Sequence, residues 1–331
     1  MKNGETVAAF EREFAAYVGA KHAIACTNGT TTLEVALRVH MTHPGASVVT
    51  SPLTMAATTL AILNAGGVPV YHDVDPDTWL LTLKGEYATY LPVSLYGLHV
   101  DWCGGCDIDD AAQTLRPMSK AAFVSYSLQR TKILSTHEGG VLCTNRDDLA
   151  AEARSVASLG YNLSASSSRI DTNAIRSPNA IRHVRLGQNS RMNDATAALG
   201  LHQLERADDL KADRVVAGCV YKMAVAGCWW ITPQAIPEGA KHDMWSFAVT
   251  VDTPERWEPL AQAIVKHGGK RPYAAWLPSY LEPALRHLAS PGTCPIAEDL
   301  QRRIMAFQTH SVASAERNAG ALRKAIQEVG E

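Results

Sequence analysis

The segment His22–Leu37, with the sequence HAIACTNGTTTLEVAL, contains the pattern that is most informative about the fold. Its first five residues form a short apolar run that predicts a strand, and Asn28-Gly29-Thr30 then predicts a turn into a helix with an apolar face over 33–37. Glycine lets the backbone approach an anion closely, and the free N–H groups of a first helical turn favour a phosphate. An ordinary helix N-cap explains the same residues, so the stretch alone leaves both interpretations open.

Strands and helices alternate on either side of this stretch. The predicted elements are a helix over 5–17, a strand over 48–50, a helix over 56–65, and strands over 68–72, 91–94, 107–109 and 121–125. This alternation is typical of an α/β domain with a mainly parallel sheet.

The second half of the chain follows a different pattern. Residues 161–190 lack periodicity and are rich in serine and arginine, which predicts a functional loop or an arm that reaches a partner. Beyond them the sequence predicts a helical stretch over 194–224, a strand over 245–251 and helices over 254–267, 295–307 and 313–329. We therefore expect two domains, a large one over 1–205 and a smaller α+β domain over 206–331.

Length and composition exclude several classes of protein. A chain of 331 residues with 46% hydrophobic and 19% charged residues can build a large core, and its length suggests about two domains. A net charge of −2 argues against a general nucleic-acid binder. No apolar run is long enough to span a membrane. A polar, acidic start without a signal-peptide core and seven scattered cysteines predict a cytoplasmic protein with reduced thiols.

Two further motifs follow predicted strands. Asp107–Gln113 (DIDDAAQ) ends a strand with carboxylates, which an open α/β sheet places in its ligand crevice. Ser127–Lys132 (SLQRTK) puts a lysine just after an apolar strand, five positions beyond a hydroxyl. Taken singly, the first is equally a helix N-cap and the second an ordinary surface lysine.

In chain order, the phosphate anchor, the carboxylate and the lysine resemble the fold type I enzymes that use pyridoxal 5'-phosphate (PLP), and in detail the DegT/StrS family of sugar aminotransferases. The matching segments run in family order over nearly the whole chain: Asn28-Gly29-Thr30, Ser51-Pro52-Leu53-Thr54, Leu95-Tyr96-Gly97, Asp110-Ala111-Ala112-Gln113, Ser127 to Lys132, Glu138-Gly139-Gly140, Gly187 to Met192 and Cys294 to Glu298. The resemblance implies a three-layer α/β/α large domain with a mainly parallel sheet and a smaller C-terminal α+β domain.

The resemblance also implies roles at the cofactor, PLP or its pyridoxamine phosphate form. Lys132 would form the internal aldimine and shuttle protons. Asp110 would pair with the pyridinium nitrogen, and Gln113 would bond the phenolic oxygen. The Gly29 and Thr30 amides would hold the phosphate together with the Ser127 hydroxyl.

Two further positions complete the cofactor site that the resemblance implies. Asn189 matches an asparagine that reaches the phosphate from the neighbouring subunit, so a homodimer with a shared active site is expected. Met55 stands where many relatives place an aromatic residue on the cofactor ring. A methionine can contact such a ring through its sulfur, or Met55 is simply part of the core.

The implied reaction is a transamination. An amino acid, glutamate foremost, would give its amino group to a keto sugar, expected to be linked to a nucleotide. A related branch that dehydrates sugars has histidine at the lysine position, so Lys132 favours transamination. Two alternatives stay open: an acceptor that is a cyclitol or another non-sugar ketone or aldehyde, and a non-catalytic relative.

Weaker signals concern the substrate. Arg182 and Arg185 in the basic loop, which also holds Arg169, Arg176 and His183, could bind substrate phosphates or form a solvated or dimer-facing cluster. Tyr273 and Trp276 could stack on a sugar or base, or pack in the core. The segments before Val93 and before Asp107 look shortened. Cys103 and Cys106 form a CxxC without a second pair of ligands, so we expect a turn there and no metal site.

Overall fold

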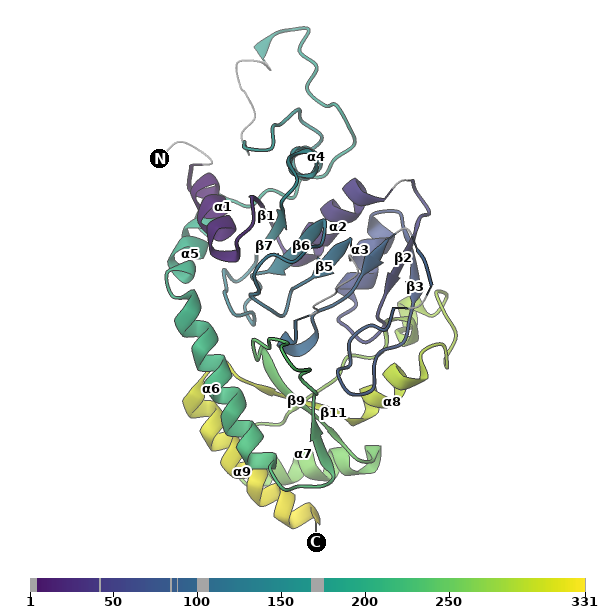
Figure 1. The fold of residues 1–331 in the computed structure, drawn as a ribbon, viewed down its shortest axis with the longest axis vertical. Coiled ribbons are helices and arrows are strands. Elements are labelled where there is room, and N and C mark those ends of the chain that lie inside the picture. Colours follow the sequence, from purple (N-terminus) through teal and green to yellow (C-terminus); the bar gives the residue numbers. More distant parts are fainter. Residues whose placement is uncertain are drawn as a thin grey trace.

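The computed structural model describes residues 5–41, 43–83, 85–87, 89–99, 107–167 and 176–330. Its N-terminal half holds a mainly parallel sheet (Figure 1), as the sequence predicts. Strand β2 (Ser47–Thr50) pairs in parallel with β3 (Val68–Tyr71) and β4 (Tyr90–Leu91). A parallel bridge from Val93 to Asp110 continues the sheet into β5 (Ile108–Asp110), which pairs in parallel with β6 (Phe123–Ser127). Strand β7 (Gly140–Thr144) is antiparallel to both β6 and β1 (His22–Cys26).

Helices cover both faces of this sheet. The side chains of β1 alternate: Ala23 and Ala25 belong to one buried cluster, whereas Ile24 and Cys26 belong to another. The first cluster includes residues of α1 (Glu5–Val18) and α5 (Asp194–Leu204). The second includes residues of α2 (Gly29–His40), α3 (Ala57–Asn64) and α4 (Asp147–Ala157). A strand period of two therefore builds three layers from one sheet.

The C-terminal part forms a second, antiparallel sheet. Its strands are β8 (Ile231–Pro233), β9 (Ser246–Val251), β10 (Tyr273–Ala274) and β11 (Ile304–Gln308), in the order β10-β11-β9-β8. Its helices are α6 (Ala207–Val225), α7 (Trp257–Lys266), α8 (Pro295–Arg303) and α9 (Val312–Gly330). One face of the sheet packs on α6, α7 and α9, and Ala248 and Ala306 on the other face join a buried cluster with Leu95 and Tyr96 of the large domain.

One prediction in this half is wrong. The expected helix over 295–307 ends at Arg303, because residues 304–308 form β11 and pair with β9 and β10 on either side. The expected helical stretch over 194–224 is confirmed and consists of two helices: α5 packs on α1 of the large domain, whereas α6 packs on the small-domain core. The domain boundary after residue 205 falls between these helices and remains our proposal.

Polar contacts connect the N-terminal and the C-terminal parts of the chain. The Asp73 carboxylate accepts hydrogen bonds from the Ile296 and Ala297 N–H groups at 2.9 Å each, at the first turn of α8. The Asp243 carboxylate lies 2.8 Å from His99 Nε2 and accepts a hydrogen bond of 2.8 Å from the Leu115 N–H group. These contacts hold the end of the parallel sheet against the small domain.

Neither a membrane span nor a metal cluster is found in the described ranges. No described helix combines the length and apolar character needed to cross a bilayer. No group of three or more described His, Cys, Asp or Glu residues is arranged to hold a metal ion. The cysteines that the structure describes, Cys26, Cys143, Cys219, Cys228 and Cys294, are all free.

Candidate active site

The N-terminus of α2 carries a complete capping box. Asn28 Oδ1 accepts a hydrogen bond of 2.9 Å from the Thr31 N–H group, and Thr31 Oγ1 accepts one of 3.3 Å from the Asn28 N–H group. The N-cap interpretation of this stretch is thus confirmed. This N-cap is compatible with a bound anion. The N–H groups of Gly29 and Thr30 lie in the first turn of α2, where they have no hydrogen-bond partner within the helix.

Close packing forms a cradle at the same place. A Cβ on residue 29 would lie 2.8 Å from the Ser127 Cβ, and a Cβ on residue 140 would lie 2.5 Å from the Asn28 carbonyl carbon. Only glycines allow β6, β7 and the start of α2 to approach this closely. The structure therefore brings the first turn of α2 against Ser127, so that main-chain N–H donors and one hydroxyl lie close together.

A buried carboxylate ends β5. Asp110 is 4% exposed, and its Oδ2 accepts a hydrogen bond of 2.8 Å from the Thr58 hydroxyl while Oδ1 accepts one of 3.1 Å from the Ala112 N–H group. Burial raises the pKa of Asp110, and these two hydrogen bonds oppose that shift by stabilising the ionised form. Gln113 is also buried, and its Oε1 accepts a hydrogen bond of 2.6 Å from the Tyr96 N–H group, which leaves its NH₂ group as a donor.

Lys132 lies in the turn after β6. Burial lowers the pKa of its ammonium group to about 8, the Asp110 carboxylate opposes this shift, and the Arg214 guanidinium adds to it. The Nζ atom lies 4.5 Å from the centroid of the Trp245 ring. The lysine side chain is half-buried, and its desolvated amine lies within the electrostatic reach of Asp110, an environment that suits a nucleophile or base.

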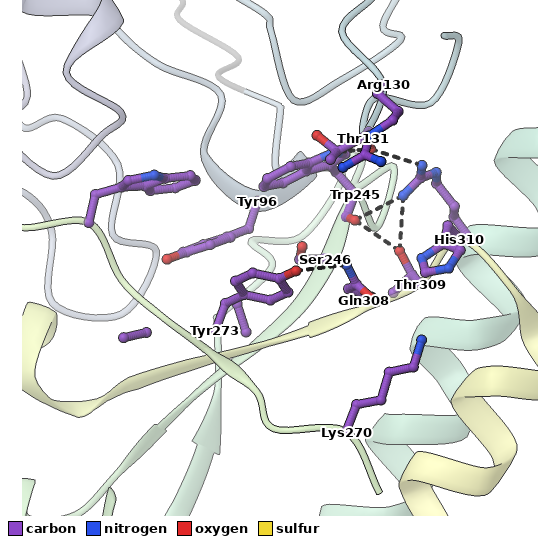
Figure 2. Close-up of a pocket in the computed structure, with 14 residues that line it drawn as sticks. Tyr96, Arg130, Thr131, Trp245, Ser246, Lys270, Tyr273, Gln308, Thr309 and His310 are labelled. Atoms are coloured by element: carbon purple, nitrogen blue, oxygen red, sulfur yellow. Dashed lines mark hydrogen bonds between the residues drawn. The ribbon is translucent and has the colours of Figure 1, made fainter. Parts of the chain in front are cut away.

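A cavity of 610 Å³ lies beside this lysine, between the two domains (Figure 2). Its aromatic wall includes Tyr96, Trp245, Tyr273 and Trp276. The Trp276 ring lies nearly parallel to those of Tyr96 and Trp245, with centroids 5.8 Å and 6.2 Å away. Tyr273 is 61% exposed, and its hydroxyl accepts a hydrogen bond of 3.2 Å from Gln308 Nε2.

The other predicted site residues lie on exposed surface. Met55 is 54% exposed just before α3, and Asn189 is exposed and bridged to Ser158. The described residues 176–190 belong to the arm that extends from the α4 side of the large domain, away from the small domain (Figure 1), and this segment includes Arg182 and Arg185. Arg185 Nη1 forms an ion pair of 2.9 Å with Glu152. Within one chain the structure thus does not bring these arginines to Tyr273 and Trp276.

Two predictions lie outside the described residues: the CxxC of Cys103 and Cys106, and the role of Arg169. Three residues without an assigned role also matter to the site. Thr58 bonds Asp110, and Arg214 donates hydrogen bonds of 3.2 Å and 3.1 Å to the carbonyl oxygens of Thr131 and Lys132. Trp245 covers Lys132. Thr58 and Trp245 lie in segments that the family resemblance places near the active site, whereas Arg214 was missed from the sequence.

The chain matches the DegT/DnrJ/EryC1/StrS aminotransferase family over residues 1–89 and 110–320. The match confirms the resemblance on which the site assignment depends. The gap between the two matched ranges includes the segment before Asp107 that looks shortened.

Individual relatives agree with this match. The chain is 32% identical over 272 residues to the GDP-perosamine synthase of Caulobacter vibrioides, which covers 74% of this chain and 69% of the relative. It is 31% identical over 280 residues to the spore coat polysaccharide biosynthesis protein SpsC of Bacillus subtilis, covering 76% and 70%. Among solved structures, NtdA of Bacillus subtilis with bound cofactor PMP superposes with a TM-score of 0.84 at 20% identity, over 98% of this chain and 78% of that chain. This last likeness confirms the fold.

Proposed function

The chain belongs to the DegT/DnrJ/EryC1/StrS aminotransferase family, and from this premise we propose that it is a PLP-dependent transaminase that moves an amino group from an amino acid to a nucleotide-linked keto sugar. The observation that carries the proposal is the half-buried Lys132, whose amine lies under the Trp245 ring and shares one electrostatic environment with Asp110 at the end of the sheet.

The residues of the site fit PLP. The cradle between Gly29 and Ser127 would hold the phosphate, because it offers main-chain N–H groups at a helix N-terminus and a hydroxyl. Asp110 would face the ring nitrogen, and the free NH₂ group of Gln113 would face the phenolic oxygen. When bound, PLP supplies an aldehyde that takes up and releases an amino group and a ring that accepts electrons.

Lys132 provides the base of the reaction. With a pKa of about 8, its side chain is half neutral at that pH, whereas a solvated lysine with a pKa of 10.5 is almost fully protonated. A neutral amine can attack a carbonyl, and as a base it can take a proton from the α-carbon of the donor and return it within the same half-reaction. The Asp110 carboxylate, fixed by Thr58, would pair with the ring nitrogen and favour its protonated form.

The acceptor class follows from the relatives. One is a GDP-perosamine synthase and another a spore coat polysaccharide biosynthesis protein, which supports a sugar acceptor. We propose that Arg182 and Arg185 contact phosphates of the nucleotide, since the exposed Arg185–Glu152 pair costs at most about 1 kcal/mol to break. Tyr273 and Trp276 would contact the sugar or base from the small domain.

The active site is proposed to need two copies of the chain. Asn189 lies exposed on the arm, free to reach the phosphate cradle of a second copy. Met55, which is half exposed just before α3, would contact the cofactor ring. A homodimer in the cytoplasm is the corresponding proposal for assembly and location.

The proposal is tested by following the amino-donor half-reaction. Purified protein loaded with PLP should lose its visible absorbance when L-glutamate is added and regain it with a keto acid. Lys132→Ala should abolish this exchange, and Lys324→Ala, a matched change of an exposed lysine on α9, should leave it unchanged. A wild-type protein that binds no PLP would refute the function. A Lys132→Ala protein that borohydride still fixes to PLP would refute the role of Lys132.

A further inference from the structure

The guanidinium of Arg214 is a buried positive charge without a counterion. Its residue is 6% exposed, and its hydrogen bonds go to neutral oxygens: the carbonyls of Trp245, Thr131 and Lys132 and the hydroxyl of Thr309. No carboxylate among the described residues pairs with it. Burial alone lowers the pKa of Arg214 to about 10, so the group is still charged at neutral pH. An unpaired buried charge is costly unless a ligand compensates it.

Arg214 is one of several cationic groups around the cavity between the domains. Arg130, Lys270 and His310 also line it, whereas the lining residues that the structure describes include no aspartate or glutamate. The side chains of Arg130 and Lys270 form no ion pair with any described carboxylate. In Figure 2 the Lys270 ammonium points up toward His310, and Arg130 lies at the opposite end of the cavity.

The positive charges of these groups affect the pKa of His310. Burial lowers the pKa of its imidazole, and the nearby Arg214 and Lys270 charges lower it further. Two cations from different elements, α6 and the segment before β10, therefore act on the same space. The volume of 610 Å³ lies within the range of about 300–1,000 Å³ that small-molecule sites occupy.

The cavity also adjoins the reacting group. Trp245 lines it, and the ring of the same residue lies 4.5 Å from Lys132 Nζ. Thr131, the neighbour of Lys132, lines the cavity as well, and its carbonyl oxygen accepts a hydrogen bond of 2.9 Å from Trp245 Nε1. A ligand in the cavity is thus separated from the lysine by one side chain.

We propose that this cavity is an oxyanion subsite: Lys270 and Arg130, at opposite ends of it, each offer a charged donor to an anionic group of a substrate, and Arg214 adds a fixed positive charge to its wall. The shared chemistry is a carboxylate or phosphate oxygen, and it has two possible sources: the second carboxylate of a dicarboxylic donor, or the diphosphate of the acceptor. The identity of these two substrates rests on the proposed function, whereas the anion site itself rests on the charged residues that line the cavity. Bidentate or charge-assisted hydrogen bonds from lysine and arginine are the usual means of holding such groups.

The test measures binding by calorimetry, with glutarate as a dicarboxylate that has no amino group and GDP as a nucleoside diphosphate. Both probes are titrated into the PLP-loaded protein and into its Lys270→Met and Arg130→Met variants. Both positions are exposed, so these changes should not disturb folding, and Lys324→Met is the matched control. We expect each cavity variant to weaken one probe about ten-fold or more, the range of one charge-assisted hydrogen bond, and the control to change neither.

The glutarate and GDP titrations together identify the source of the anion. Weaker glutarate binding with unchanged GDP binding assigns the subsite to the amino donor, and the reverse assigns it to the acceptor. The proposal is overturned if the wild-type protein binds neither probe, or if both variants bind both probes as tightly as the control. Because binding needs no turnover, a protein that fails to exchange amino groups but binds a probe through Lys270 would contradict the proposed function and leave the subsite standing.

Discussion

Replacing Gly29 by alanine tests the geometry of the phosphate cradle directly. The added Cβ would lie 2.8 Å from the Ser127 Cβ and 3.3 Å from the Ser127 Cα. Carbon atoms in contact prefer about 3.5–4.0 Å, so the start of α2 or the end of β6 must move by about 1 Å. Overpacking on this scale destabilises a protein by about 1–3 kcal/mol.

The same movement weakens cofactor binding. The N–H groups of α2 and the Ser127 hydroxyl would no longer converge on one point, and each lost hydrogen bond to a charged group costs about 1.5–3 kcal/mol. We therefore expect the dissociation constant for PLP to rise about ten-fold or more in Gly29→Ala. Absorbance titration with PLP gives this constant, and urea unfolding of the cofactor-free protein gives the stability change.

Two further variants separate the steric effect from other causes. Gly320→Ala in α9 adds a Cβ that meets nothing within 4 Å, so it should be neutral or stabilise the helix by up to about 1 kcal/mol. Ser127→Gly removes the atom that clashes, and in the Gly29→Ala background it should restore stability without restoring PLP affinity, which needs the hydroxyl. If the Gly29→Ala protein has the same urea stability and the same dissociation constant for PLP as the wild type, the close contact with Ser127 determines neither property.

Three other changes test neighbouring parts of the structure. Thr58→Val removes the hydroxyl that bonds Asp110 and should slow the donor half-reaction about ten-fold; an unchanged single-turnover rate would contradict this. Because the pKa of Lys132 is lowered to about 8, its amine gains neutral form as pH rises, so PLP uptake by cofactor-free protein should accelerate through that pH; stopped-flow rates that rise only near 10.5 would disagree. Glu11→Gln leaves the buried Arg154 guanidinium, now 2.8 Å from Glu11 Oε2, without its counterion and should destabilise the protein by about 3–5 kcal/mol, whereas an unchanged urea midpoint would show that the pair contributes nothing.

The sequence predicts the large-domain fold well where the pattern is local. The strand at 22–26 and the helix after Asn28 follow from short apolar runs and one capping signal, and the structure confirms both. The run at 304–308 was predicted as the end of a helix, because apolar residues next to Arg303 suit either structure. Its pairing with β9 and β10, far away in the chain, decides for a strand.

The break between α5 and α6 shows the same limit. Neither glycine nor proline lies between Leu204 and Ala207, and Arg206 at the N-cap of α6 makes no side-chain cap hydrogen bond. No local signal ends the helix there. The break exists because the two helices pack on different cores, which only the folded chain defines.

Some residues of the candidate site could likewise be predicted from the sequence, and others could not. Asp110 and Ser127 end strands in recognisable motifs, so their neighbourhood could be predicted. Thr58 reaches Asp110 across 52 positions and is marked in the sequence only by the segment in which it lies. Arg214 reaches the Lys132 carbonyl across 82 positions and does not differ in the sequence from an ordinary helical side chain.

The reactivity of Lys132 is therefore a property of both domains, although its motif belongs to one. Trp245 at the edge of β9 covers the ammonium, and Arg214 on α6 holds the carbonyl oxygens of the lysine turn while its charge lowers the lysine pKa. A large domain without α6 and β9 would keep Lys132 and Asp110 but expose the amine to water, and desolvation is the largest cause of its lowered pKa. In the proposed mechanism the small domain thus contributes to the chemistry of Lys132, because contacts from α6 and the start of β9 favour its neutral amine.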